Sequence, residues 1–165
     1  MVVISFLDAQ IEKIEAQARA DDPDALAEAS KLIEEYPSEV KTWALRAYIY
    51  GREENYGKAI EDYTRAIDLC PTEPCLFFDR VIEYSKIGDY RRAIDDCTRG
   101  LALCDLHSSD YYREVLHFFR ANAYLELGNR VAALEDLQYV RNDFLWWIND
   151  IRTKQDLLAR CSIDG

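Results

Sequence analysis

The chain has 165 residues, enough for one domain, and its 49% apolar and 31% charged residues are typical of a folded, soluble protein. Its formal net charge of −11 argues against binding nucleic acid or an anionic membrane through a basic surface. The charge either keeps a helical protein in solution or favours a basic protein partner. No apolar run reaches the roughly 18 residues that cross a bilayer. The start, MVVISFLDAQ, has no basic flank of a signal peptide, so we expect a cytoplasmic location.

One segment of the sequence is repeated later in the chain. The stretches NYGKAIEDYTRAIDLCP, residues 55–71, and DYRRAIDDCTRGLALCD, residues 89–105, are identical at eight of 17 aligned positions. The same offset joins Trp43 to Phe77, and a slightly longer offset joins Gly88 to Gly128. Self-similarity at a fixed period predicts an array of one supersecondary unit.

Each repeat is predicted to form two helices. Trp43, Ala47 and Tyr50 recur at helical spacing in the first half of one repeat, and the stretch AIEDYTRAI continues that spacing in its second half. Gly88 and Gly128 fall between paired helices, where we expect a positive φ that glycine adopts without steric cost.

The expected organisation is a single domain over residues 1–165. In chain order it contains a degenerate repeat at 6–39, repeats at 40–73 and 74–107, an insertion at 108–113, a repeat at 114–147 and a capping helix at 148–161. The insertion is expected to lengthen a connection, with a loop at one rim as the alternative. The capping helix would cover the last exposed core with one apolar face.

The repeated residues resemble the pattern of the tetratricopeptide repeat family. In residues 40–73 the matching positions are Trp43, Ala47, Tyr50, Tyr56, Ala59, Tyr63, Ala66 and Pro71. The resemblance implies an all-α, right-handed superhelical solenoid of antiparallel helix pairs. The sequence departs from the pattern at Arg46, Arg80 and Arg120, which stand where the family usually has Leu. We expect these arginines to tie neighbouring repeats together by pairing with acidic residues of adjacent helices.

No catalytic constellation is found in the sequence. His107 and His117 lie in no recognised nucleophile motif, and there is no P-loop or GxGxxG. The five cysteines are an odd number without a CxxC pair, and Cys97 falls in a core position of its repeat. We therefore predict a protein that is not an enzyme and that uses no metal and no cofactor.

The first helix of each pair would line a concave surface that is unusually apolar. The predicted partner-binding residues are Ala44, Leu45, Tyr48, Arg52, Phe78, Asp79, Ile82, Lys86, Phe118, Phe119, Asn122 and Trp146. Three interpretations remain open: a partner peptide or helix fills this groove, the protein fills it with its own amino-terminal segment or tryptophans, or the groove is a homodimer seam. Trp146 is either packed on the last repeat or an exposed anchor.

These features predict a protein–protein interaction module that acts as an adaptor, an assembly chaperone or an inhibitor of a basic protein. The alternative is a structural or homo-oligomeric component of a larger assembly. Chaperone adaptors of the family hold an acidic carboxy-terminus in a clamp of Lys, Asn and Arg. The equivalent positions here are Gln10, Ile14, Leu45 or Asp79, Val115 and Phe119, so this clamp is not expected.

Overall fold

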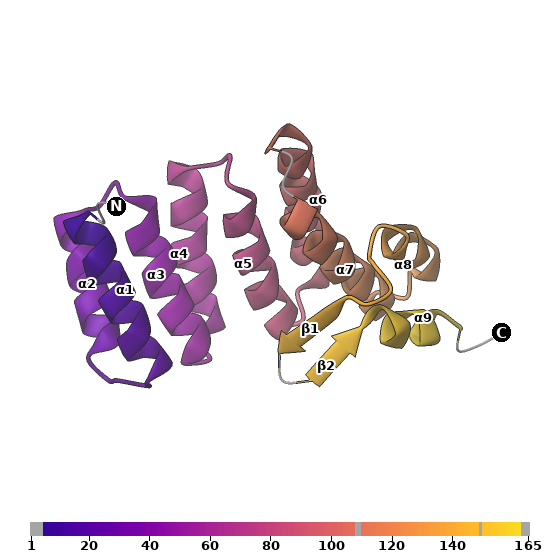
Figure 1. Ribbon diagram of the computed structural model, residues 1–165, viewed down its shortest axis with the longest axis horizontal. Coiled ribbons are helices and arrows are strands. Elements are labelled where there is room, and N and C mark those ends of the chain that lie inside the picture. Colours follow the sequence, from indigo (N-terminus) through magenta and orange to yellow (C-terminus); the bar gives the residue numbers. More distant parts are fainter. Residues whose placement is uncertain (1–4, 108–109, 149, 163–165) are drawn as a thin grey trace. The chain divides into compact units, whose positions relative to one another are not determined.

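The computed structural model describes residues 5–107, 110–148 and 150–162. Within these ranges the chain is helical apart from one two-stranded hairpin, which confirms the all-α class (Figure 1). The chain divides into two compact units, Met1–Thr72 and Glu73–Gly165, where the sequence led us to expect a single domain. None of the helices in the described ranges combines the length and the apolar character needed to cross a bilayer.

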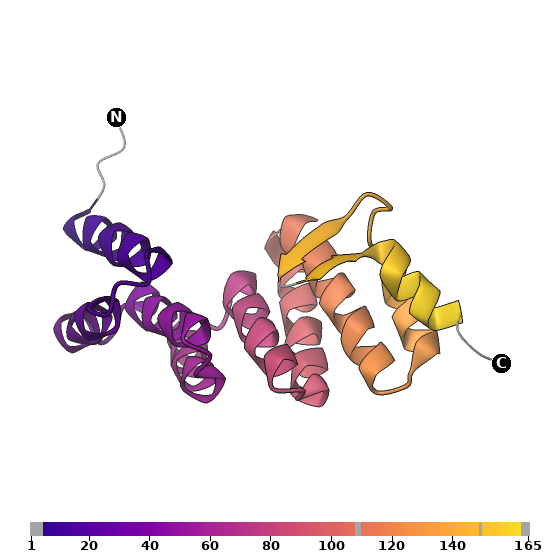
Figure 2. The same ribbon diagram turned by 90° about the horizontal axis from the view of Figure 1, so that it is seen from below.

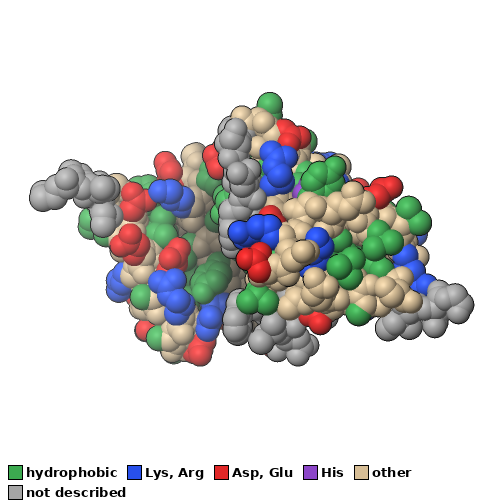
Figure 3. All heavy atoms as spheres, turned by 45° about the vertical axis from the view of Figure 1, so that its right-hand side comes forward, with side chains coloured by type: hydrophobic (Ala, Val, Ile, Leu, Met, Phe, Trp, Pro, Cys, Tyr) green, Lys and Arg blue, Asp and Glu red, His purple; other side chains and the backbone are tan. Residues whose placement is uncertain are grey.

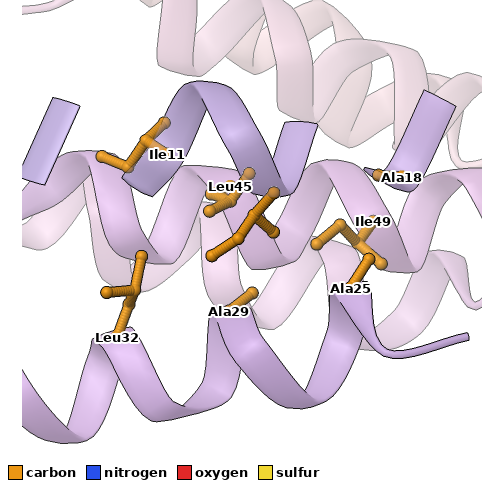
Figure 4. Packing of buried hydrophobic residues seen from close by; sticks show 8 residues of the cluster. Ile11, Ala18, Ala25, Ala29, Leu32, Leu45 and Ile49 are labelled. Atoms are coloured by element: carbon orange, nitrogen blue, oxygen red, sulfur yellow. The ribbon is translucent and has the colours of Figure 1, made fainter. Parts of the chain in front are cut away.

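The first unit contains two helix pairs, α1 (Phe6–Arg19) with α2 (Ala25–Glu35) and α3 (Val40–Arg52) with α4 (Tyr56–Leu69). The segment expected to be a degenerate repeat therefore forms a helix pair of its own. Figure 4 shows how the pairs join: α1, α2 and α3 direct apolar side chains into one core. Its buried members are Ile11, Ile14, Ala18, Ala25, Ala29, Leu32, Leu45 and Ile49.

The second unit begins with α5 (Pro74–Lys86) and α6 (Tyr90–His107), followed by α7 (Asp110–Glu126) and α8 (Arg130–Leu137). The insertion expected at residues 108–113 is largely helical, because α7 already starts at Asp110; residues 108 and 109 lie outside the described ranges. The added residues lengthen two helices. Helix α6 has 18 residues, against 14 in α4, which is the second helix of its pair as α6 is. Helix α7 has 17 residues, against 13 in α3, which is likewise a first helix.

The carboxy-terminal part differs from the prediction. Strands β1 (Leu145–Ile148) and β2 (Asp150–Thr153) form an antiparallel hairpin, and only then does α9 (Lys154–Ser162) begin (Figure 2). The expected capping helix at 148–161 is thus wrong for its first residues, and the last repeat ends its second helix at Leu137, not near residue 147.

The local sequence explains both the strand and the start of α9. The run LWWI is rich in residues that favour strands. Asp156 accepts a hydrogen bond from the Thr153 amide and donates its own amide to Thr153 Oγ1, which starts α9 at Lys154.

Two glycines end helices as predicted. Gly88 has a φ of 74° and Gly128 a φ of 77°, the left-handed conformation that glycine adopts most easily. The next residue then turns its amide back onto the helix: Asp89 N donates to Tyr84 O at 2.9 Å, and Asn129 N donates to Tyr124 O at 2.8 Å.

An arginine–aspartate pair recurs in three helix pairs, each time at the same spacing in the sequence. Arg46 binds Asp62 with its Nε and Nη2 atoms at 2.7 and 2.9 Å. Arg80 binds Asp96 in the same way at 2.7 and 2.8 Å, and Arg120 binds Asp136 at 2.8 and 2.7 Å. Such parallel, charge-assisted hydrogen bonds fix both the distance and the orientation of the two side chains.

The three arginines therefore act within a helix pair. Their acidic partner lies on the second helix of the same pair, so the expectation that acidic residues join neighbouring repeats is wrong. A link to the preceding pair runs through hydroxyl groups instead. Arg46 Nη1 donates to Ser30 Oγ at 3.4 Å, and Arg120 Nη1 donates to Thr98 Oγ1 at 3.1 Å.

We predict that Asp96→Asn lowers the free energy of unfolding by about 3–5 kcal/mol, because it leaves the buried Arg80 charge without its counterion. Only 8% of the Arg80 side chain and 4% of the Asp96 side chain are exposed. The control is Asp89→Asn, which neutralises the more exposed Asp89–Arg92 pair and should cost less than about 1 kcal/mol. Urea unfolding followed by circular dichroism measures both; equal effects would contradict the prediction.

Candidate functional site

The residues predicted on α3 do not form an open apolar face. Leu45 is 3% exposed because it belongs to the core shared with α1 and α2, so its assignment to the groove is wrong. Ala44 and Tyr48 are half-buried, and Tyr48 packs against the edge of the same core. Arg52 is exposed, and its Nη2 atom binds Asp21 Oδ1 at 2.8 Å.

The inner face of α7 is covered by the protein's own carboxy-terminal segment. Phe118 is buried against Phe144, with ring centroids 4.9 Å apart. Asn122, also buried, accepts a hydrogen bond from Arg160 Nη1 at 3.0 Å, and Arg160 Nη2 binds Glu126 at 2.8 Å. Phe118 and Asn122 therefore do not line an open groove, contrary to the prediction.

Trp146 on β1 closes the aromatic cluster between α5 and α7. Its ring meets Phe78 edge-to-face at 5.4 Å and Phe119 edge-to-face at 5.2 Å, and these two rings meet each other at 5.6 Å. Such pairs contribute about 0.5–1.5 kcal/mol each beyond the area they bury. Phe78 and Phe119 are accordingly buried, so in this unit a tryptophan of the chain fills the aromatic face.

The indole N–H of Trp146 lacks a hydrogen bond, although the ring itself is well packed. Its Nε1 atom is buried and has no hydrogen-bond partner. A buried donor without an acceptor costs about 1–3 kcal/mol relative to one that is paired. The rings therefore favour the docked position of Trp146, while the unpaired N–H opposes it.

Two carboxyl groups, those of Asp79 and Glu83, are the main electrostatic feature of α5. Burial raises the pKa of Asp79 to about 7. Burial, together with the nearby charge of Asp79, raises the pKa of Glu83 to about 7 as well, although Lys86 acts in the opposite direction. Asp79 is half-buried and Glu83 is only 7% exposed, with Oε2 lacking a hydrogen-bond partner. Ile82 is half-buried and Lys86 exposed on the same helix.

The repeat register shows what is unusual about these acids. In the alignment that pairs residues 55–71 with residues 89–105, Asp79 corresponds to Leu45 and Glu83 corresponds to Ile49. In α3 those two positions are apolar and belong to the core with α1 and α2. Helix α5 thus carries two carboxyl groups at positions where an otherwise similar repeat carries hydrocarbon.

Several side chains that shape the candidate site and its helix pairs were missed in the sequence. Glu83 was not considered, although its alignment with Ile49 distinguishes it from an ordinary surface acid. The partners Asp62, Asp96 and Asp136 could have been found from their constant spacing to an arginine. The role of Arg160 had no signal of this kind, since it depends on where α9 lies.

No metal centre is assembled in the described part of the chain. No group of three or more His, Cys, Asp or Glu residues there could hold a metal ion. His117 is buried with Nδ1 2.7 Å from Asp136 Oδ1, and its ring stacks on Tyr139. Cys97 is buried in the core as predicted, and burial keeps the pKa of its thiol well above the usual value. The side chain of His107 lies outside the described residues.

The raised pKa values predict a stability that falls as the pH rises. Because the folded protein holds protons on Asp79 and Glu83 up to about pH 7, the free energy of unfolding should decrease between pH 4 and pH 7 and level off above. The double variant Asp79→Leu with Glu83→Ile should remove this slope and add about 1–3 kcal/mol at pH 8. Chemical unfolding at several pH values measures the effect. Asp95→Asn, which changes an exposed acid on α6, is the control, and a slope unchanged in the double variant would contradict the assignment.

The comparisons with known proteins agree with this architecture. The family model for the tetratricopeptide repeat matches residues 40–73. No curated protein sequence matches the chain. Among solved structures, MamA superimposes with a TM-score of 0.64 at 19% identity, covering 84% of this chain and 74% of its own. The OM64 tetratricopeptide repeat domain from Arabidopsis reaches 0.62 at 16% identity, covering 74% of this chain and 93% of its own.

A further similar structure is the TPR2B domain of yeast Sti1 in complex with pHsp70, with a TM-score of 0.62 at 14% identity. That comparison covers 70% of this chain and 96% of the yeast domain. The resemblance to the tetratricopeptide repeat family is therefore confirmed: residues 40–73 are a tetratricopeptide repeat, and the chain has the fold of solved domains of this kind.

Proposed function

We propose that this protein is a protein–protein interaction module that recognises a basic partner. The observation that carries the proposal is the tetratricopeptide fold itself, whose helix pairs present extended faces suited to binding another polypeptide. The module would act as an adaptor, an assembly chaperone or an inhibitor that neutralises a basic protein.

The accessible stripe of α5 is the part of the predicted site that we assign to the partner. It consists of the half-buried Asp79 and Ile82 and the exposed Lys86; Glu83 on the same helix is buried. Neither Asp79 nor Glu83 forms an ion pair with a described residue. A lysine or arginine of a partner would supply the missing countercharge and would strengthen the charged form of both acids. The net charge of −11 adds long-range attraction for the same kind of partner.

A second candidate function is that of a homo-oligomeric or structural component. The observation that favours it is the apolar surface of α8, where Val131 is 70% and Leu134 is 42% exposed. Figure 3, which brings the right-hand side of Figure 1 forward, shows hydrophobic side chains among charged ones on that face. Light scattering at micromolar concentration separates the two candidates, because a monomer contradicts the second.

The cysteines support the expected cytoplasmic location. Cys70, Cys75, Cys97, Cys104 and Cys161 are all free thiols. A chain with this many unpaired thiols suits a reducing compartment.

We predict that neutralising α5 weakens partner binding about fivefold to tenfold. The variant Asp79→Asn with Glu83→Gln keeps the side-chain shapes but removes the charges that would pair with a basic partner, a loss of about 1–1.4 kcal/mol. The partner is first captured from the host with the wild-type chain and identified, and its Kd is then measured by calorimetry at low and high salt.

The control for this experiment is Asp95→Asn, which removes one exposed charge from α6. A Kd that neither the α5 variant nor salt changes would contradict a basic partner. Failure to capture any stoichiometric partner would contradict the interaction function as a whole.

A separate prediction concerns acidic carboxy-terminal peptides of the kind that chaperone adaptors bind. We expect no binding at micromolar concentration. Leu45, Val115 and Phe119 occupy clamp positions and are buried, and Asp79 would repel a peptide carboxylate. Fluorescence anisotropy with a labelled acidic tail peptide, and with a scrambled basic peptide as control, measures this. A Kd in the micromolar range for the acidic peptide would contradict the prediction.

A further inference from the structure

Phe78 on α5 and Phe119 on α7 form a site that Trp146, a residue of the chain itself, fills; we call the site that these two rings form the pocket. Trp146 meets Phe78 and Phe119 edge-to-face from a strand, β1, and not from a helix of the repeats. The neighbouring Leu145 is 49% exposed, so the strand directs one side chain inward and the one before it toward solvent. Helices α5 and α7 thus bind an aromatic side chain, that of Trp146, which is carried by an extended strand.

Among the described residues, the hairpin that supplies Trp146 has no third strand, and its Trp146 ring contacts α5 and α7. Strand β1 pairs with β2, and no further strand extends this sheet in the described residues. An isolated two-stranded hairpin is marginally stable in water. The indole Nε1 of Trp146 is buried without a hydrogen-bond partner, so undocking restores a hydrogen bond to water.

The segments on either side of the hairpin have anchors of their own. On one side Phe144 is buried against Phe118. On the other side α9 is held by the fully buried Leu157 and by Arg160, which binds Asn122 and Glu126. Release of Trp146 from the two phenyl rings would therefore leave the contacts of both flanks unbroken.

We propose that the pocket of Phe78 and Phe119 binds an aromatic side chain carried by an extended segment of a partner protein, and that Trp146 is its built-in competitor. The proposal rests on the proposed function, since it names what one surface of the interaction module recognises. The docked hairpin keeps the pocket closed to weak ligands, and a partner with a better-placed aromatic anchor opens it. The pocket walls are aromatic rings, which suit an indole or phenyl group more than an aliphatic one.

The probe is a labelled peptide with the sequence DFLWWIND, residues 143–150 of this chain, offered to the full-length protein. We expect Trp146→Ala to bind the peptide at least tenfold more tightly than the wild type, because its pocket is vacated. A peptide with alanine at the position of Trp146 should lose this binding. The matched protein control is Leu145→Ala, which alters the exposed neighbour on the same strand and should bind like the wild type.

Equal affinity of the peptide for Trp146→Ala and wild type would overturn the proposal. Circular dichroism first verifies that the variant is folded. If it is not, hydrogen exchange of the Trp146 indole N–H in the wild type decides: exchange faster than that of the α7 backbone amides supports a displaceable hairpin, and equally slow exchange overturns it. A wild-type mass of two chains that falls to one in Trp146→Ala would assign the occupant to a second copy, which also overturns the proposal.

The two proposals fail in different ways. A captured partner whose Kd is the same for the wild type and Trp146→Ala leaves the interaction function standing and removes only the aromatic pocket. A peptide that binds Trp146→Ala while no partner is captured removes the interaction function and keeps the pocket as a property of the fold.

Discussion

The recurring arginine–aspartate pair is the interaction on which three of the helix pairs depend, those from α3 to α8. Apolar side chains of about the right size are sufficient for helices to pack, but a single well-ordered arrangement needs more specific contacts. A guanidinium held by two parallel hydrogen bonds permits one register between two helices. In this protein the pair occurs in α3–α4, in α5–α6 and in α7–α8 with nearly identical distances. The arginine stands where the family pattern usually has Leu, so a directional ion pair takes the place of an apolar contact.

The aromatic side chains serve stability and recognition in different places. The cations Arg46 and Arg65 lie over the ring of Trp43, and Arg92 lies over Tyr84. These contacts are outside the aromatic cluster and add to the stability of single helix pairs. None of these three cation contacts involves a ring of the cluster under β1, which contains rings from α5, α7 and β1. It is the feature best suited to exchange one apolar occupant for another.

The sequence was sufficient for the helix pairs because their signals are local and repeated. The positive φ of Gly88 and Gly128 and the buried Cys97 follow from spacing alone. Gly100, which breaks the alanine pattern, is explained only by its neighbours, since a Cβ there would lie 2.8 Å from Leu116 Cδ1. The candidate groove was less predictable, because helical periodicity identifies a face but not what covers it. Trp146 reaches α7 from β1 and Arg160 reaches it from α9, and the sequence has no repeat to compare with either element.

The position of the covering segment late in the chain has a consequence for biosynthesis. Helices α5 and α7 are complete when residue 126 has been made, yet Trp146 and Arg160 reach the ribosomal exit only afterwards. A growing chain therefore passes through a stage in which several phenyl rings face water, and such a stage is prone to association with other nascent polypeptides. Slow translation of the last stretch would prolong that exposure, whereas mutations in the first helices would not.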